Sequence, residues 1–474
     1  MPRFDEDREL VFTPVNELAR LIKRKKLSPV ELMEAVFRRI EELNPKLNAF
    51  LTLAEEEALA SAKKAEESLI KGIDHGPLHG MPVAIKDLYM TKGIRTTSGS
   101  LVYKDFVPDE DGLLAKRMKE AGAIIIGKTN TPEYGCANFT ENKLGDACRN
   151  PWNAQRSSGG SSGGAGASVA AGMCPISPGS DGGGSIRIPS SLCGIFGLKP
   201  TYGRVPYDID PVYGPAIDFV CHGPMTRNVR DAAFLLNVMS GHDREDYNSM
   251  KDTPPDFFKE LESSLKTLRI AWSPDLGYAE VDPEVRSHTE AAVHTFEEMG
   301  HKIEEAAPPI DPPFHIWENI ASAQNDLLLG FHLDEHPEML MPYFRTSLEI
   351  GRKLSGAELI KAWIEVGRWR VKMLEFFQTY DLLMTPATAV PAFPIGSKSK
   401  KLGYGMIEWG LTPFTPLFNF THNPAATIPC GFTSDGLPVG LQIVGRLKDE
   451  STILKASYAF ERARPWEDKR PSIS

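Results

Sequence analysis

Residues 157–200 read SSGGSSGGAGASVAAGMCPISPGSDGGGSIRIPSSLCGIFGLKP. Two clusters of glycine and serine, at 159–164 and 180–185, flank a segment of small apolar residues. A flexible linker is polar throughout, whereas this stretch also carries valine, isoleucine, leucine, methionine and phenylalanine. The glycines are therefore expected to be buried, where the backbone takes a positive φ or comes very close to another group.

The second cluster ends in a serine that is a candidate nucleophile. Successive glycine N–H groups can surround one negatively charged oxygen, and three glycines precede Ser185. The candidate donors of this oxyanion hole are the N–H groups of Gly182, Gly183, Gly184 and Ser185. Glycine-rich turns also bind phosphate or allow close packing, so the pattern alone leaves those alternatives open.

A serine hydroxyl needs a neighbouring base in order to attack a carbonyl. No GxSxG elbow surrounds Ser185, and the 11 histidines have no informative neighbours. A different base is available in Pro82-Val83-Ala84-Ile85-Lys86, where apolar residues lead into Lys86 as in a buried strand. Most lysines are solvated surface charges, but burial here would disfavour the charged ammonium.

Ordered motifs along nearly the whole chain resemble those of the amidase signature family. They lie at 79–87 (HGMPVAIKD), 127–133 (GKTNTPE), 159–164, 181–189, 197–201 (GLKPT), 223–227 (GPMTR), 380–386 and 436–442 (GLPVGLQ). The resemblance implies an α/β fold, in which a large mixed central β-sheet is covered by helices on both faces. It also implies amide hydrolysis without a cofactor, and no metal constellation is evident in the sequence.

The resemblance further implies a Ser-cisSer-Lys triad. Ser185 would be the nucleophile, Ser161 the bridging serine after a cis peptide bond, and Lys86 the terminal base. In this scheme an acyl-enzyme forms on Ser185, and Ser161 hands a proton to the leaving nitrogen. The loop at 131–138 is implied to line the acyl side of the pocket. Its substrate-binding candidates are Tyr134, Gly135 and Cys136.

Two residues depart from the family pattern. Gly182 stands where the family usually has threonine or isoleucine, which predicts a looser oxyanion hole unless its neighbours brace it. His422 stands where the family usually has glycine. We expect a surface or hydrogen-bonded structural histidine there, the alternative being an imidazole near the pocket.

Three charged residues near these motifs are interpreted as structural. Asp181 and Arg187 flank the nucleophile, and two charges beside a buried loop need partners, so we expect them to pair and brace the turn. Glu133 is expected to cap or brace its loop rather than act as a general acid.

Composition excludes several classes of function. The formal net charge is −10, and no long basic block follows residues 23–26, so no nucleic-acid partner is expected. The N-terminus lacks an apolar signal core, and no apolar run approaches ~18 residues, which predicts a cytoplasmic protein without a membrane partner. The 6 cysteines are widely spaced without a CxxC pair, which disfavours a zinc site and indicates reduced thiols.

The chain is expected to form a single amidase-signature domain over residues 1–474. Its expected parts are an N-terminal helical scaffold at 1–75, a catalytic core with the triad at 76–240, a variable substrate and lid segment at 305–415, and a C-terminal return to the core sheet at 416–474. The scaffold helices are also a candidate surface for a homodimer.

Individual elements are predicted from periodicity and end signals. A helix begins at the N-cap Ser28 and should stop at Asn44-Pro45. A small-residue helix at 165–173 should point its N-terminus at the active site, and residues 437–445 should form a strand of the same sheet. Most aromatic residues of 308–407 are expected in the core, with a lid over a bulky or aromatic substrate in 391–416.

The leading hypothesis is a serine hydrolase that cleaves the carbon–nitrogen bond of carboxamides. The resemblance extends to bacterial acylamidases and urethanases, so aryl amides, carbamates and esters are candidate small-molecule substrates. The alternative is the glutaminase subunit of a tRNA-dependent amidotransferase, although residues 205–210 do not resemble the usual sequence of that protein. A nucleotide-binding module is disfavoured, because no GxxxxGK[ST] or correctly spaced GxGxxG occurs.

Overall fold

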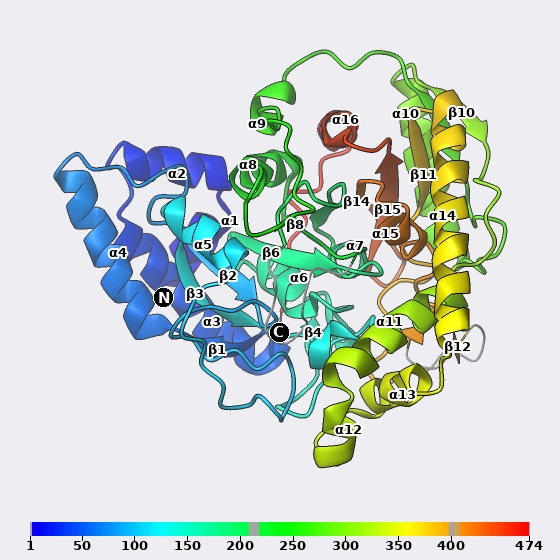
Figure 1. Ribbon diagram of the computed structural model, residues 1–474. Coiled ribbons are helices and arrows are strands. Elements are labelled where there is room, and N and C mark those ends of the chain that lie inside the picture. Colours follow the sequence, from blue (N-terminus) through cyan, green and yellow to red (C-terminus); the bar gives the residue numbers. More distant parts are fainter. Residues whose placement is uncertain (1, 208–217, 398–402, 405–406, 474) are drawn as a thin grey trace.

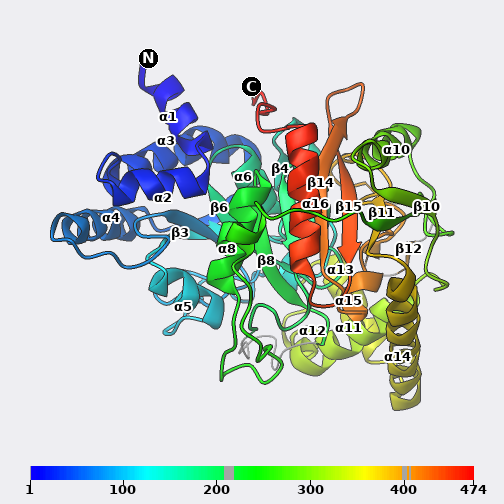
Figure 2. The same cartoon turned by 90° about the horizontal axis from the view of Figure 1, so that it is seen from above.

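The computed structural model describes residues 2–207, 218–397, 403–404 and 407–473. An 11-stranded mixed β-sheet crosses the molecule, and helices lie on both of its faces (Figures 1 and 2). This is the α/β architecture that the resemblance implied.

The strands lie side by side in the order β1-β3-β2-β6-β8-β7-β14-β15-β11-β9-β10. Their bounds are β1 Phe50–Leu53, β2 Pro82–Lys86, β3 Ile124–Thr129, β6 Ile176–Asp181, β7 Phe196–Lys199, β8 Cys221–Thr226, β9 Arg269–Trp272, β10 Lys302–Glu305, β11 Leu382–Pro386, β14 Ala425–Phe432 and β15 Pro438–Gly445. Two separate hairpins pair β4 (Arg149–Asn150) with β5 (Asn153–Ser157) and β12 (Gly403–Tyr404) with β13 (Ile407–Glu408). Strands β3, β2 and β6 run parallel, so their carboxyl ends meet at one edge.

The helices connect and cover these strands. Their bounds are α1 Pro2–Phe12, α2 Val15–Lys23, α3 Pro29–Leu47, α4 Glu55–Ile70, α5 Leu113–Glu120, η1 Glu133–Gly135, α6 Gly163–Ala170, α7 Arg187–Cys193, α8 Val229–Met239, α9 Phe257–Glu260, α10 Pro283–Glu298, α11 Phe314–Leu329, α12 Phe331–Glu335, α13 Pro342–Gly351, α14 Gly356–Thr379, α15 Leu417–Phe420 and α16 Glu450–Ala463. The small-residue helix predicted at 165–173 is confirmed, but α6 begins at Gly163 and ends at Ala170, so residues 171–173 lie outside it. Strand β15 joins the sheet as predicted.

Strand β15 shows directly that both faces of the sheet are covered. A Cβ at Gly440 would meet Ser191 of α7, whereas a Cβ at Gly445 would meet Ile453 of α16. Positions five residues apart on a strand point to opposite faces, so α7 and α16 lie on opposite sides. All eight residues of β15 are accordingly buried.

The N-terminal helices pack together at one edge of the sheet (Figure 1). The Ser28 hydroxyl caps α3 as predicted, accepting from the N–H groups of Val30 and Glu31. The predicted stop at Asn44-Pro45 is wrong, because α3 continues through Pro45 to Leu47. Pro45 disturbs only the last turn, and that turn is held by the fully buried side chain of Leu47.

The late aromatic residues mostly form core, as predicted. Trp317, Trp369, Trp409 and Phe414 belong to one buried cluster between α11, α14 and the sheet. Parts of the predicted lid, at 398–402 and 405–406, lie outside the described residues.

Two other kinds of feature are absent from the described residues. No helix in those ranges has the length and apolar character that a membrane span requires. No group of three or more histidine, cysteine, aspartate or glutamate side chains is placed there so that it could hold a metal ion.

Candidate active site

The carboxyl end of β2 places Lys86 against the hydroxyls of both glycine-serine clusters. The Lys86 side chain is fully buried. Its Nζ lies 2.6 Å from Ser161 Oγ, 3.0 Å from Ser162 Oγ and 2.9 Å from Ser180 Oγ. Ser180 comes from the neighbouring strand β6, while the other two serines precede α6. The parallel pairing of β2 and β6 therefore brings the lysine and the serine clusters together.

Burial changes the acid–base behaviour of Lys86. Removal from water lowers the pKa of its ammonium to about 7, although the negative charge of Asp181 opposes the shift. A lysine with such a pKa is substantially neutral near pH 7, so its amine can accept a proton.

The peptide bond between Gly160 and Ser161 is cis, as the resemblance implied. Glycine fits before this bond because a Cβ at Gly160 would lie within 3 Å of the backbone of Phe139 and Ala137. Ser161, the candidate bridging serine, therefore follows a backbone position that has no room for a side chain.

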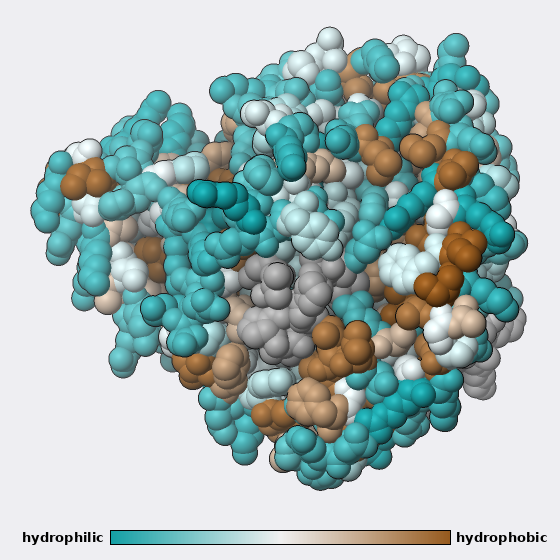
Figure 3. All heavy atoms as spheres, in the orientation of Figure 1, coloured by the Kyte–Doolittle hydropathy of each residue, from teal (hydrophilic) through white to brown (hydrophobic). Residues whose placement is uncertain are grey.

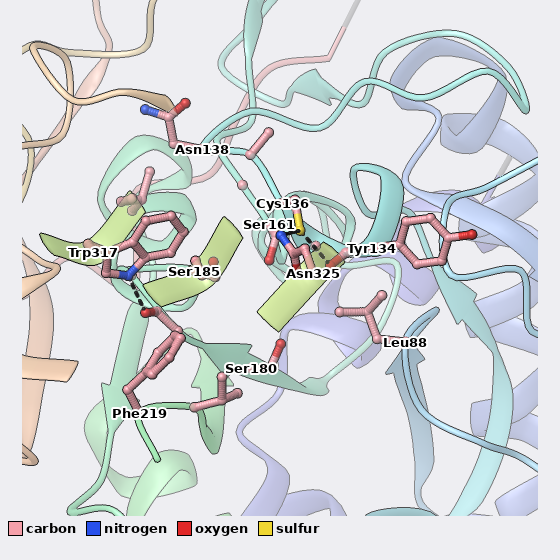
Figure 4. A pocket seen from close by; sticks show the side chains of 18 of the residues that line it. Leu88, Tyr134, Cys136, Asn138, Ser161, Ser180, Ser185, Phe219, Trp317 and Asn325 are labelled. Atoms are coloured by element: carbon pink, nitrogen blue, oxygen red, sulfur yellow. Dashed lines mark hydrogen bonds between the residues drawn. The ribbon is translucent and has the colours of Figure 1, made fainter. Parts of the chain in front are cut away.

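Ser185 lies between the glycine turn and α7, and lines the same cavity as Ser161 (Figure 4). Its carbonyl oxygen accepts the N–H of Ser162 at 3.1 Å, which ties the two clusters together. The two serines and the lysine of the predicted triad are thus gathered from three separate segments.

Asp181 and Arg187 form the predicted pair at the base of this turn. Arg187 Nη2 lies 2.8 Å from Asp181 Oδ1, and both side chains are fully buried. Burial by itself would raise the pKa of Asp181, but the charge and hydrogen bond of Arg187, the hydrogen bond from Asn419 and the charge of Lys199 together hold it well below its usual range. The same carboxylate accepts the N–H groups of Gly184 at 2.8 Å and Ile186 at 3.1 Å. The pair braces the turn.

The Asp181 carboxylate reduces the number of N–H donors that remain available to the predicted oxyanion hole. The Gly184 N–H donates to Asp181, so it is already engaged inside the turn. The N–H groups of Gly182, Gly183 and Ser185 have no acceptor among the described residues. The described geometry therefore leaves three of the four predicted donors available.

The carbonyl groups of the turn are also held. Trp317 Nε1 donates to Gly182 O at 2.8 Å, and Thr415 Oγ1 donates to Gly183 O at 2.6 Å. A peptide unit is planar, so fixing the Gly182 oxygen also fixes the direction of the Gly183 N–H. The additional glycine at 182 is thus braced by its neighbours, as the departure from the family pattern required.

The cavity beside Ser185 is predominantly apolar. All three predicted substrate-binding residues, Tyr134, Gly135 and Cys136, line it. Further lining side chains come from distant segments: Leu88, Phe219, Trp317, Gln324, Asn325 and Trp409. Figure 4 places Trp317 and Phe219 on the Ser185 side and Leu88 and Tyr134 beyond Ser161. None of the described residues that line the cavity carries a charge at neutral pH.

Comparison with known proteins agrees with this geometry. The model of the amidase family matches residues 31–454. This chain belongs to the amidase signature family.

Two relatives of similar identity carry the names of different activities. The amidase is 36% identical to an acylamidase of Rhodococcus erythropolis over 479 residues, covering 99% of each chain. It is 37% identical to the A-type subunit of the glutamyl-tRNA(Gln) amidotransferase of Geobacillus thermodenitrificans over 486 residues, covering 97% of this chain and 99% of the relative.

The solved structures that are similar to this chain also include both an acylamidase and an amidotransferase subunit. A bacterial aryl acylamidase superposes with a TM-score of 0.90 at 29% identity, covering 97% of this amidase and 99% of that chain. A 6-aminohexanoate cyclic dimer hydrolase superposes with a TM-score of 0.88 at 28% identity, covering 98% and 99%. The A-type subunit of the glutamyl-tRNA(Gln) amidotransferase of Thermotoga maritima superposes with a TM-score of 0.79 at 29% identity, covering 98% of each chain.

Glu133 braces its loop, as expected. Its carboxylate accepts from Ser100 Oγ at 2.7 Å and from the Met341 N–H at 2.5 Å. Burial raises the pKa of Glu133 to about 7. Glu133 is not among the described residues that line the cavity.

His422 is a structural histidine in this amidase. Its ring stacks on Tyr202 with centroids 4.5 Å apart, and its Nε2 lies 2.7 Å from Asp218 O and 2.9 Å from Arg370 Nη2. His422 is not among the described residues that line the cavity.

Sequence reasoning missed the residues that reach the site from far along the chain. Phe219, Trp317, Asn325 and Thr415 contact the turn or the cavity, but no local motif marks them. Ser180 was visible as the first residue of the second cluster, two positions before Gly182. Ser180 lies near the carboxyl end of β6, as Lys86 does in β2, and this shared position could have predicted their contact.

Proposed function

We propose that this amidase hydrolyses uncharged carboxamides that carry a bulky or aromatic group, with anilides as the model class. The observation that carries the proposal is the lining of the cavity, where aromatic side chains surround Ser185 and no described residue is charged. Aromatic surfaces bind apolar groups without requiring a compensating charge. The acylamidase relatives support the same class.

In the proposed mechanism, Lys86 is the terminal base and Ser161 the relay. The neutral amine takes a proton from Ser161, which takes one from Ser185 as its Oγ attacks the carbonyl carbon. The N–H groups of Gly182, Gly183 and Ser185 stabilise the tetrahedral oxyanion. Ser161 then donates a proton to the leaving nitrogen, the carbon–nitrogen bond breaks, and an acyl-enzyme remains.

Water completes the proposed cycle. It loses a proton to the same relay as it attacks the ester of Ser185, and the carboxylic acid leaves as Ser185 is reprotonated. Carbamates and esters pass through the same kind of oxyanion, so we propose them as secondary substrates. Esters depend least on Ser161 as an acid, because an alkoxide is a better leaving group than an amide anion.

We also propose that residues 305–415 determine substrate choice in this amidase. Helix α11, within this segment, supplies both Trp317 and Asn325 to the cavity. The free thiols of all 6 cysteines support the cytoplasm as the compartment.

The second candidate is glutamine hydrolysis, favoured by the amidotransferase relatives. Free glutamine carries an ammonium and a carboxylate, and burying either without a partner is costly. The described lining offers neither charge a counter-ion, so the geometry favours the uncharged amides.

A substrate panel tests the proposal. Purified enzyme is assayed with p-nitroanilides of graded acyl size, the matching esters and carbamates, and L-glutamine, with Ser185→Ala as the blank. We expect the anilides to be cleaved with a kcat/KM at least about 100-fold above that of glutamine, the discrimination that unpaired buried charges produce. Equal or faster release of ammonia from glutamine would reverse the assignment.

A further inference from the structure

Helix α14 presents an apolar stripe to solvent. Ile360, Ile364, Val371 and Leu374 expose 59%, 52%, 54% and 54% of their surfaces. The helix runs along the outer edge of the molecule, and Figure 3 shows apolar side chains over its position on that face. Large exposed apolar side chains in a continuous row mark an interaction surface more often than isolated ones do.

The stripe is distinct from the face that packs on the protein. The inward positions of α14 are Ala362, Val366, Trp369, Met373 and Phe377, all of which are buried. The exposed positions 360, 364, 367, 371 and 374 are separated by four, three, four and three residues. That alternation is the spacing of a coiled-coil seam, which a helix needs to pair with another helix.

Gly367 lies at the centre of the stripe. A Cβ at this position would have no neighbour within 4 Å, so the glycine is not needed for packing inside this chain. Glycine in the middle of a helix costs about 0.5–1 kcal/mol relative to alanine. On the outer face, however, it lets a second helix come close at the crossing point.

We propose that the α14 stripe is the contact between two copies of this chain, paired antiparallel about a two-fold axis near Gly367. In that arrangement Ile360 packs beside Leu374 of the second copy, and Ile364 beside Val371. The stripe is therefore complementary to itself, as a two-fold interface requires.

Charge supports the antiparallel direction. Lys361 and Glu375 occupy equivalent flanking positions toward opposite ends of the stripe, and both are exposed. Antiparallel pairing places each Lys361 opposite Glu375 of the second copy, whereas parallel pairing keeps these two residues two heptads apart along the seam and forms no such pair. The interface thus contains two attractive pairs related by symmetry. The same axis places Arg368 opposite Arg368 of the second copy, and each of these guanidinium groups is paired within its own chain with Glu365 at 2.8 Å.

A membrane surface is the other partner that an apolar stripe could serve. Helices that lie on membranes carry a predominantly basic polar face, because the lipid surface is negative. The residues beside this stripe include Glu365 and Glu375 as well as Lys361 and Arg368, and the chain has a net charge of −10. This mixture favours a second protein copy.

The full-length chain tests this proposal by light scattering after size exclusion and by sedimentation equilibrium. We expect twice the 52.3 kDa chain mass at micromolar concentration. Ile364→Glu combined with Val371→Glu should give the monomer mass with unchanged circular dichroism. The matched control is Leu327→Glu, at an apolar residue of α11 that is 83% exposed and lies off the stripe, which should remain dimeric.

Charge reversal tests the direction of pairing. Lys361→Glu or Glu375→Lys alone should raise the dissociation constant of the dimer about tenfold, and the double reversal should restore it. A monomeric wild-type chain, or a dimer that survives the paired glutamate substitutions, would overturn the proposal. If the protein is monomeric and binds anionic phosphatidylserine vesicles through the stripe, the stripe is a membrane-binding surface instead.

Discussion

Trp317 Nε1 donates to the carbonyl oxygen of Gly182 at 2.8 Å, joining α11 to the turn that precedes Ser185. The indole ring also covers Gly183, where a Cβ would lie 3.1 Å from Nε1. The same ring lines the cavity, so one side chain contacts both the substrate space and the turn. The direction of the Gly183 N–H therefore depends on a residue that also shapes the substrate site.

Removing this hydrogen bond should weaken stabilisation of the oxyanion. We expect Trp317→Phe to lower kcat about tenfold or more for anilides, with KM changed less than about threefold, because a misdirected donor is lost mainly in the transition state. Trp409→Phe is the matched control. Trp409 lines the same cavity, but its Nε1 has no partner among the described residues. Equal kcat losses in the two variants would remove the positioning role of Trp317.

The roles of the two serines can be separated with a fluorophosphonate probe, which reacts covalently with an activated serine. Wild-type enzyme should be labelled rapidly, and Ser185→Ala should not be labelled. Ser161→Ala should react about 10²- to 10⁴-fold more slowly, as expected when proton transfer is lost. Ser190→Ala is the control, because this nearby buried hydroxyl has no partner in the described structure. Labelling of Ser185→Ala at the wild-type rate would place the nucleophile elsewhere.

Local patterns marked Lys86 and Ser185 as candidates, because each follows a short segment of unusual apolar or glycine-rich composition, whereas Ser161 was implied by the family resemblance. The structure places Lys86 Nζ 2.6 Å from Ser161 Oγ, and Ser161 and Ser185 line one cavity. The Asp181–Arg187 pair was also predictable locally, since both residues flank one turn. In contrast, Trp317 reaches Gly182 across 135 positions of sequence, and its helix looks like any other amphipathic helix.

Two local predictions differ from the structure. Four donors were expected at the oxyanion hole from the run of glycines, but the buried carboxylate of Asp181 takes the N–H of Gly184. Helix α3 passes Pro45 because its last turn ends on the buried Leu47.

The buried pair under the turn should contribute strongly to stability. Arg187→Met leaves the Asp181 carboxylate buried without its counter-ion, so we expect a loss of about 3–5 kcal/mol in the free energy of unfolding. Urea unfolding followed by circular dichroism measures this loss. Arg269→Met is the control, since the Arg269–Glu304 ion pair is 47% and 45% exposed, and its removal should cost far less. Losses of equal size would contradict the bracing role of Arg187.

Activity should fall on the acid side of neutrality because Lys86 must be uncharged to accept a proton. Its pKa of about 7 predicts that kcat/KM for anilides decreases about tenfold per pH unit below that value and levels off above it. Circular dichroism at each pH separates this loss from unfolding. Glu133 also has a pKa of about 7, so Glu133→Gln is the necessary control and should keep the acid limb. Lys86→Met should lose nearly all activity, and an acid limb that disappeared in Glu133→Gln would transfer the titration to the loop carboxylate.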